Sequence, residues 1–417
     1  MELRRSTAPI TRRLATLQSL LSLGPIELSS TARRLRRSPS VHDVRKLAAR
    51  RLPRIVFDFI DGAAEDELSL RWNSAAYRQL EFVPRVLIDV SSVDTATTIL
   101  GRPAQLPLVL APTGLTGLAH PAGETAAARA AGRAGIPYAL STLASQTIEQ
   151  VAASNSGADL WFQVYVWRDR GLVSSLLERA RNAGYRAILL TVDTAVAGYR
   201  ERDVRRGLSI PFRIGPRAIL DALTHPSWTW RMTGGGPVGF ANIDGSRASD
   251  ATDPSELAAF IGRQFDPTVA WHDVQWFRDN WDGPVVIKGI QSVSDAVRAA
   301  EVGVDAIVLS NHGGRQLDGS PAPAQLIAPV AETVGDRLEV LCDGGLRRGS
   351  DLAKAVAMGA TAGMIGRPYL YGLAAAGRPG VDHVVETYRT GLERSMALAG
   401  RTSITQLEPD LVRWRRA

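Results

Sequence analysis

Short apolar runs alternate with alanine-rich stretches along the chain from about residue 107 onward. A run of this kind that stops at glycine or at polar residues is typical of a strand buried on both faces. The eight runs begin at residues 106 (LPLVLAPTG), 137 (PYALST), 160 (LWFQVYV), 187 (AILLTVD), 284 (PVVIKG), 306 (AIVLSNHGG), 339 (EVLCDGG) and 362 (AGMIGRP). The segments between them, such as RGLVSSLLERARNAG and SDLAKAVAMGA, predict helices, and several of them end in glycine.

Eight strand–helix units in succession predict an α/β protein with a closed (β/α)8 barrel, the TIM-barrel fold, preceded by an N-terminal helical extension. A doubly wound sheet is the competing architecture, but no G-x-G-x-x-G segment follows the first strand. One connection is unusually long, since 97 residues separate the starts of the fourth and fifth runs. We expect a long loop over residues 201–270 that is an active-site lid, a membrane-contacting patch or only a packed cover of the barrel.

Positive charge is concentrated at the N-terminus. Residues 1–54 hold 13 basic and 3 acidic side chains, a net charge of +10 compared with +7 for the whole chain of 417 residues. A basic arm of this kind contacts anionic lipid, nucleic acid or an acidic partner surface, or it is a solvated leader with no such role.

The remaining composition fits a soluble or peripheral globular protein, with 45% hydrophobic and 22% charged residues. The lone cysteine, Cys342, excludes an intramolecular disulfide and fits a reducing cytoplasm, and no cysteine cluster suggests a metal site. Residues 14–26 lack a clear signal-peptide cleavage site, and four prolines within residues 103–123 argue against a spanning helix there.

Polar side chains follow each predicted strand at its C-terminal end, where barrel enzymes place their chemistry. They are Thr113, Ser141, Gln163, Tyr165, Thr191, Asp193, Lys288, Ser310, His312, Arg315, Asp343, Arg347 and Arg367. Glycine is followed by arginine in residues 344–347 and 366–367. Because backbone N–H groups and guanidinium groups can converge there on one anion, the last two strands predict a phosphate site.

Four of these segments together resemble the signatures of one enzyme family. They are LTVDT (190–194), IKGI (287–290), SNHGGRQLDG (310–319) and CDGGLRRGSD (342–351). The chain is similar in them to the FMN-dependent 2-hydroxy-acid oxidases and dehydrogenases, which include glycolate oxidase, L-lactate dehydrogenase and mandelate dehydrogenase. The resemblance implies an enzyme domain over residues 41–407, flanked by a basic arm (1–40) and a C-terminal tail (408–417).

The resemblance implies oxidation of a 2-hydroxy acid to the 2-oxo acid with FMN as the cofactor. It makes His312 the expected base and Asp193 the carboxylate that stabilises the resulting imidazolium. Arg315 and Arg200 are expected to bind the substrate carboxylate, and Tyr165 to hydrogen-bond a substrate oxygen. Taken alone, Arg200 could equally be a solvated arginine and Tyr165 a packing residue.

Lys288 is expected to stabilise reduced FMN, because an unpaired ammonium at a buried strand end would be costly. The contacts implied for the flavin ring are Ala111, Pro112, Thr113, Ser141, Gln163, Thr191 and Ser310. The contacts implied for the ribityl chain and the phosphate are Asp343, Gly344, Gly345, Leu346, Arg347, Gly366 and Arg367. No metal site is expected.

Three positions depart from the family pattern. Phe59 stands where the family usually has a tyrosine that helps to bind the substrate carboxylate, which removes a hydrogen bond worth about 1.5–3 kcal/mol. Leu143 stands where glycolate oxidase has a tryptophan, and Gly114 adds little bulk. These changes make room for a larger substrate side chain, or neighbouring residues fill the space.

The main expectation is an (S)-2-hydroxy-acid dehydrogenase that oxidises L-lactate and passes electrons to a quinone-like acceptor, as in bacterial L-lactate dehydrogenases. An alternative is an oxygen-dependent oxidase of a bulkier or aromatic acid such as mandelate. A non-catalytic FMN-binding or membrane-docking protein is a third, and the presence of Asp193, His312, Arg315 and Lys288 together argues against it. The resemblance also implies a homo-oligomer, commonly a tetramer, that is cytoplasmic or peripheral at the inner membrane face and binds no nucleic acid.

Overall fold

The computed structural model describes residues 29–154, 157–207, 216–234, 238–243 and 260–415. The chain divides into two compact units, residues 1–38 and 39–417. In the described part of the first unit, the Ser29 hydroxyl caps α2 (Ser30–Arg36) by accepting a hydrogen bond from the Ala32 N–H. Most of the predicted basic arm lies outside the described residues.

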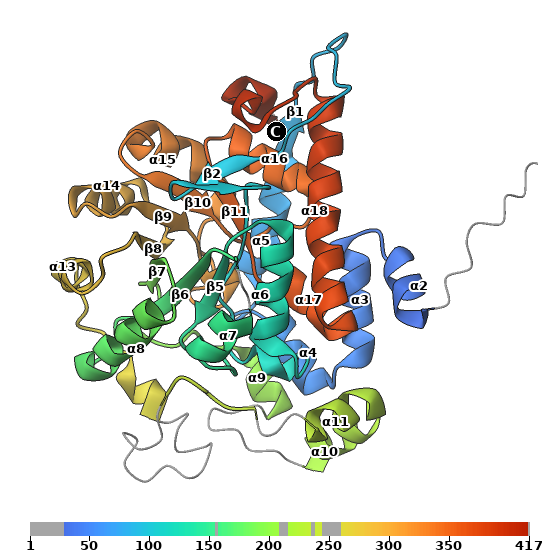
Figure 1. Ribbon diagram of the computed structural model, residues 1–417, viewed down its shortest axis with the longest axis vertical. Helices are drawn as coiled ribbons and strands as arrows, with labels where there is room; N and C mark the ends of the chain where they lie inside the picture. The colour runs from blue at the N-terminus through green and yellow to red at the C-terminus, as the bar shows by residue number, and fades with distance from the viewer. Residues whose placement is uncertain (1–28, 155–156, 208–215, 235–237, 244–259, 416–417) are drawn as a thin grey trace, which may run out of the picture. The chain divides into compact units, whose positions relative to one another are not determined.

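Eight parallel strands form a closed barrel in the second unit, in the order β10-β11-β4-β5-β6-β7-β8-β9 around the ring (Figure 1). The strands are β4 (Leu108–Leu110), β5 (Tyr138–Ser141), β6 (Leu160–Tyr165), β7 (Ala187–Thr191), β8 (Val285–Ile290), β9 (Ala306–Leu309), β10 (Glu339–Cys342) and β11 (Ala362–Ile365). Each strand coincides with one of the eight apolar runs, so the predicted (β/α)8 barrel is confirmed.

The interior of the barrel is filled by alternate residues of the strands. Val109, Trp161, Leu189, Val308 and Leu341 belong to one buried cluster, separate from the larger core that includes the other strand residues. Because successive side chains of a strand point to opposite faces, this cluster fills the barrel and the larger core packs beneath the helices.

One end of the barrel is closed by a hairpin, β2 (Thr97–Ile99) and β3 (Arg102–Ala104). The Leu100 N–H in its turn donates to the Glu339 carboxylate at 2.9 Å, and the Leu100 carbonyl accepts from Arg186 at 2.9 Å. Glu339 and Arg186 lie at the N-terminal starts of their strands. The hairpin therefore covers the N-terminal face, and the opposite face is left for ligands.

Helices surround the barrel and extend it at the N-terminus. Those that alternate with the strands or follow them are α6 (Gly123–Ala134), α7 (Ile148–Ser154), α8 (Arg170–Asn182), α14 (Val293–Glu301), α15 (Ile327–Val334), α16 (Gly349–Ala357), α17 (Arg367–Ala376) and α18 (Arg378–Leu398). Those that precede the barrel are α3 (Val41–Arg51), α4 (Arg54–Asp61) and α5 (Leu68–Gln79). Since α3 packs against α17, and α5 against the 3-10 turn His312–Gly314, the predicted helical extension reaches the C-terminal face.

Two predicted irregular segments contain regular structure. The long connection after β7 holds α9 (Glu201–Arg206), α10 (Pro216–Leu223), α11 (Pro226–Thr233) and α13 (His272–Asp279) among its described residues, so the predicted loop 201–270 is partly helical. Within the predicted tail 408–417, β12 (Val412–Trp414) pairs antiparallel with β1 (Leu80–Phe82). This sheet could not be predicted from the sequence, because strands of three residues carry too little periodicity.

Candidate active site

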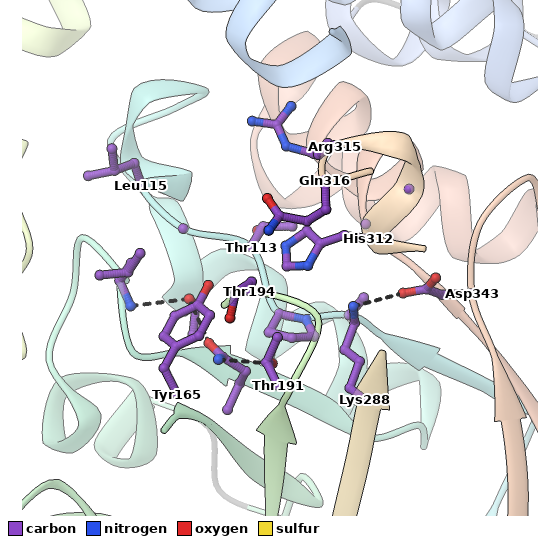
Figure 2. Close-up of a pocket in the computed structure, with 18 of the residues that line it drawn as sticks. Thr113, Leu115, Tyr165, Thr191, Thr194, Lys288, His312, Arg315, Gln316 and Asp343 are labelled. Carbon is purple, nitrogen blue, oxygen red and sulfur yellow. Dashed lines mark hydrogen bonds and ion pairs between the residues drawn. The ribbon is translucent and has the colours of Figure 1, made fainter. Parts of the chain in front are cut away.

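A cavity of about 860 Å³ lies at the C-terminal end of the barrel. Its polar floor continues the inward-facing rows of the barrel, since each floor residue lies two positions after an apolar residue of the inner cluster. These residues are Ser141, Gln163, Thr191, Lys288 and Asp343, which follow Ala139, Trp161, Leu189, Val286 and Leu341. The fold thus directs one polar side chain from each of five strands into the same space, as Figure 2 shows for Thr191, Lys288 and Asp343.

His312 and Asp193 form a pair at this end of the barrel. The Nδ1 atom of His312 lies 2.9 Å from Oδ1 of Asp193, whose side chain is only 3% exposed. Burial alone would raise the pKa of Asp193, but the charges of His312 and Lys288 outweigh it and lower the pKa. An ionised Asp193 accepts the Nδ1 proton, which leaves Nε2 of His312 able to take up another.

The backbone around this pair is adapted to its close approach. Gly289 has φ of +114°, and a Cβ atom there would lie 2.8 Å from Cβ and Cγ of Asp193. His312 itself has φ of +55°, an uncommon value for a residue with a side chain. The turn is held by Asn311, whose side-chain oxygen accepts from the Gly314 N–H at 3.1 Å. These features fix where the imidazole ring lies.

Lys288 is buried at the end of β8 and has two polar partners. Its ammonium donates to the Ser310 hydroxyl at 3.0 Å and lies 3.3 Å from the Asp343 carboxylate. Burial lowers the pKa of Lys288, but the charges of Asp343 and Asp193 more than offset this and raise it overall. The cavity therefore keeps a positive charge in its floor. The Ser310 hydroxyl also accepts from the His312 N–H at 3.0 Å, which ties the two sites together.

A chain of neutral hydrogen bonds crosses the neighbouring strands. The Ser141 hydroxyl donates to the side-chain oxygen of Gln163 at 3.1 Å, and the Gln163 amide donates to the Thr191 hydroxyl at 3.1 Å. All three side chains are buried. Because these bonds fix the orientation of the amide, they present a defined polar edge to a ligand.

Tyr165 and two arginines line the cavity together with the histidine. The Tyr165 ring packs against Trp167 and Phe265, with centroid distances of 5.9 and 5.3 Å, and burial raises the pKa of its hydroxyl. Tyr165 is therefore a neutral hydrogen-bond donor at neutral pH. Arg200 caps the start of α9, and its Nε donates to Asp203 at 2.8 Å. Burial, and after it the charge of Arg200, lower the pKa of Arg315.

The residues of the predicted phosphate site line the same cavity. Gly344 and Gly345 have φ of +79° and +89°, and a side chain on Gly345 would collide with the Asn73 backbone. Arg347 and Arg367 line the cavity beside them. Arg367 donates to the carbonyls of Ile60, Gly62 and Gly313, at 3.2, 2.7 and 2.9 Å.

The cavity gathers the residues that the sequence singled out, with two exceptions. Those that line it are Phe59, Ala111, Pro112, Thr113, Ser141, Gln163, Tyr165, Thr191, Arg200, Lys288, His312, Arg315, Asp343, Gly344, Gly345, Leu346, Arg347, Gly366 and Arg367. Asp193 and Ser310 do not line it, because they lie behind His312 and Lys288 and bond to them.

Residues that the sequence did not single out hold these groups in place. The Gln316 amide donates to the carbonyls of Asp193 and Val196, both at 2.9 Å, and so ties the β7 loop to the β9 loop. Asn73 and Asn311 exchange two side-chain hydrogen bonds, at 2.7 and 2.8 Å. Gln316 and Asn311 stand inside the SNHGGRQLDG motif and could have been found there, whereas Asn73 on α5 carries no local signal.

The donor and acceptor set of the cavity fits FMN. The cofactor has a phosphate, a hydroxylated chain and a ring with polar edges, and the cavity offers arginines, a glycine-rich turn and the Ser141–Gln163–Thr191 chain. The Oδ1 atom of Asp343 is buried and lacks a hydrogen-bond partner within the described part of the chain. An unpaired buried carboxylate oxygen is costly, so it suits a ligand that brings a hydroxyl donor.

Comparisons with known proteins agree with this geometry. The family model for FMN-dependent dehydrogenase matches residues 48–414. L-lactate dehydrogenase of Caulobacter sp. (strain K31) is 41% identical over 376 residues, which are 89% of this chain and 98% of that protein. (S)-Mandelate dehydrogenase of Pseudomonas putida is 41% identical over 371 residues, 89% of this chain and 93% of that protein. The crystal structure of the monotopic membrane protein (S)-mandelate dehydrogenase matches with a TM-score of 0.86 and 40% identity, covering 90% of this chain and 99% of that one.

Proposed function

The chain belongs to the family of FMN-dependent dehydrogenases, enzymes that act on the CH–OH group of 2-hydroxy acids, and from this premise we propose that it oxidises L-lactate to pyruvate. The observation that carries the proposal is the His312–Asp193 pair at a cavity also lined by Arg200 and Arg315. It supplies a base, a counter-ion for that base and a positively charged site for a carboxylate.

Arg315 and Arg200 would bind the substrate carboxylate. The Nη1 group of Arg315 donates to the backbone carbonyls of Phe59 and Gly62 at 2.8 and 2.9 Å, which leaves its Nε and Nη2 protons for an anion. A guanidinium fork of this kind binds a carboxylate with two parallel hydrogen bonds. The anion would also relieve the repulsion that Arg200 exerts on Arg315.

His312 would take the proton from the substrate hydroxyl at Nε2, because Nδ1 is engaged with Asp193. The imidazolium that results is stabilised by the Asp193 carboxylate, which is buried and ionised. Tyr165, as a neutral donor, would hydrogen-bond a substrate oxygen.

When FMN is bound, it supplies the acceptor for the two electrons that leave the substrate. Lys288 would stabilise negative charge on the reduced cofactor, since its ammonium is buried at the cavity floor. Ser141, Gln163, Thr191 and the backbone of residues 111–113 would hold the ring. The contacts we propose for the ribityl chain and phosphate are Asp343, Gly344, Gly345, Leu346, Arg347, Gly366 and Arg367.

A second candidate substrate is a bulkier acid such as (S)-mandelate. The cavity has apolar walls that include Leu143, Phe240, Ile261 and Phe265, and its total volume is about 860 Å³. Phe59 also presents an apolar ring there, beside the Arg315 guanidinium. These walls would accept an aromatic side chain, and the similarity to mandelate dehydrogenase supports the same reading.

We further propose that electrons leave for a quinone-like acceptor at a membrane surface, with oxygen as the alternative acceptor. No helix in the described ranges is long and apolar enough to cross a bilayer. On α10 and α11, however, Leu220, Leu223 and Trp230 are 64%, 65% and 81% exposed. Large exposed apolar side chains mark contact surfaces. Those on the long connection after β7 would contact the lipid headgroup layer and hold the enzyme at the membrane.

The membrane proposal is tested by co-sedimentation with anionic lipid vesicles. A triple change of Leu220, Leu223 and Trp230 to serine should release the protein into the supernatant while leaving reduction by the hydroxy acid intact. Equal sedimentation of both proteins would reject these helices as the contact. We also propose that the protein is cytoplasmic and forms a homotetramer. Size-exclusion chromatography with light scattering measures its oligomeric state.

The first test of the reaction is the visible spectrum of the FMN-loaded protein after anaerobic addition of L-lactate. Bleaching of the flavin bands would establish cofactor, reaction and substrate together. A spectrum that bleaches only with (S)-mandelate would replace lactate by the aromatic acid. If neither acid bleaches the bound flavin, the proposed activity is rejected.

A further inference from the structure

The C-terminal end of α4 supplies backbone acceptors for two arginines of the cavity. Arg315 donates to the carbonyls of Phe59 and Gly62, and Arg367 donates to those of Ile60 and Gly62. These carbonyls lie at the negative end of the helix, where a guanidinium is favoured. The position of α4 therefore sets where both arginines lie.

The end of α4 is in turn held by one buried carboxylate, Asp61, which is 4% exposed. Its two oxygens accept from Arg45 Nε and Nη2 at 2.6 and 2.7 Å, from the Tyr371 hydroxyl at 2.7 Å and from Arg202 Nη1 at 3.0 Å. These donors come from α3, α17 and α9. Asp61 thus joins the end of α4 to three other helices.

The third of these helices, α9, carries the other clamp residue, Arg200, at its N-terminal cap. Arg202 also pairs with Glu67 at 2.5 Å, and Arg206 pairs with Asp58 of α4 at 2.7 Å. The helix is consequently fastened to α4 at two successive turns. Arg200 and Arg315 belong to different strand–loop units, and the contacts of α4 link them.

Such a link matters because Arg200 and Arg315 carry like charges. After burial, the charge of Arg200 lowers the pKa of Arg315, and Asp203, which pairs with Arg200, acts in the opposite sense. Without a bound anion, the two guanidinium groups would move apart unless their supports were fixed. Asp61 supplies both a negative charge and hydrogen bonds where α4 meets α3 and α9.

We propose that Asp61 is a positioning residue for the substrate-carboxylate clamp formed by Arg200 and Arg315, and that Arg202 is the partner through which it positions α9. The inference rests on the proposed function, which assigns the clamp. Asp61 does not line the cavity, so its action is indirect.

The test uses Asp61→Asn, which keeps the shape of the side chain and removes its charge, and Arg202→Gln. Three quantities are measured with FMN in excess. The dissociation constant of oxalate, a non-oxidisable carboxylate, is obtained from the change in the flavin spectrum, and KM and kcat are measured for L-lactate. We expect both variants to raise the oxalate dissociation constant and KM about tenfold or more, with kcat changed far less.

Asp159→Asn is the matched control. Asp159 forms a similar bidentate pair with Arg186, at 2.5 and 2.8 Å, but at the N-terminal end of the barrel, remote from the clamp. This variant should lose stability and keep oxalate affinity within about twofold of wild type. An equal loss of oxalate affinity in Asp159→Asn, or none in Asp61→Asn, would overturn the proposal.

Two further outcomes remain distinguishable. If Asp61→Asn fails to fold, Arg202→Gln decides, because the Arg202 side chain is 32% exposed and its removal is better tolerated. If lactate does not reduce wild-type protein, the proposed function fails. The oxalate titration still tests the clamp, because it does not require turnover.

Discussion

His312 holds a left-handed backbone conformation, with φ of +55°, that costs a residue with a side chain about 1–2 kcal/mol. The cost is offset by bonds on both sides, from the His312 N–H to Ser310 and from Gly314 to Asn311. The conformation brings the ring to Asp193, which follows β7, so that the pair spans the end of β8, the strand between β7 and β9. Five other described residues besides glycine also have a positive φ, so it is the position of His312 beside Asp193 that makes its conformation a candidate for a functional one.

Replacing His312 with alanine should lower kcat by about 10³-fold, because general base catalysis by a positioned side chain contributes on this order. His312→Asn serves as a second variant, since asparagine accepts the left-handed conformation at less cost. FMN should remain bound in both, as its absorbance would show. His272→Ala, at an exposed histidine, is the control. Unchanged turnover in the His312 variants would remove this residue from the mechanism.

Phe59→Tyr restores the hydroxyl that the family pattern leads one to expect. The ring lines the cavity and lies 5.4 Å from Cζ of Arg315, so a hydroxyl on it can reach a carboxylate bound there. We expect KM for L-lactate to fall about tenfold, because a hydrogen bond to a charged group is worth about 1.5–3 kcal/mol. Phe57→Tyr, on the same helix but outside the cavity lining, should leave KM unchanged. Equal effects of the two variants would contradict this.

At the residue scale, the sequence identified side chains but not the contacts that orient them. His312 and Asp193 could be singled out because distinctive residue types stand at the ends of apolar runs. The carbonyl groups that orient Arg315 could not, since every residue has one and no letter of the sequence distinguishes them. The roles assigned to these residues stay predictions until the variants are measured.

At the scale of elements, the strands were predictable and the supports of the site were not. Each barrel strand is a local apolar run, so its position follows from residues that are neighbours in sequence. The helix α4 acts through partners far along the chain, such as Arg202 and Tyr371, and local periodicity carries no information about them. Asp61, the C-terminal residue of α4, is not among the site residues predicted from the sequence.

The C-terminal end of β8, where Gly289 lies, tests how closely this strand must pack against the loop after β7. Gly289→Ala would place a methyl group 2.8 Å from Asp193 at φ of +114°, so Asp193 or the loop must shift. We expect kcat to fall about 10²-fold, since a displacement of about 1 Å can cost that much. Gly184→Ala also has a positive φ, +81°, but nothing lies within 4 Å of the added atom. Steady-state kinetics of both should separate collision from backbone strain, and similar kcat values would reject the collision.

For the second unit as a whole, stability should depend on pH through Asp61. Burial alone would raise the pKa of Asp61, but hydrogen bonds from Arg45 and Tyr371 and the charge of Arg45 lower it to about 2. Because the folded-state pKa lies below the ordinary value of 3.8, the stabilisation is complete well above pH 3.8 and is lost as the pH falls toward 2. It amounts to about 2 kcal/mol at neutral pH.

The measurement is chemical unfolding of wild type and Asp61→Asn at pH 7 and at pH 3. The difference between their free energies of unfolding should narrow by about 1 kcal/mol toward the lower pH, because at pH 3 the Asp61 carboxyl is mostly protonated in the unfolded chain but still mostly ionised in the folded one. A difference that stays constant over this interval would show that the charge of Asp61 contributes nothing to pH-dependent stability.

The last strand of the second unit pairs with a strand that precedes the barrel in the chain. The match to the family model runs to residue 414, which is also the last residue of β12, and that strand pairs with β1. This pairing could not be read from three-residue strands, whereas the closed barrel followed from eight repeated units. Repetition made the architecture predictable, and the single, non-repeated contacts required the structure.

Cys342 ends β10 in the barrel wall, with no exposed surface, and its sulfur lies 3.7 Å from the Tyr77 hydroxyl. Burial raises the pKa of this thiol to about 12. A thiol-specific reagent can therefore react with the chain's one cysteine only in molecules whose barrel has opened. The rate of thiol labelling in native buffer without denaturant then measures how often the barrel opens. A ligand that stabilises the closed barrel should lower this rate.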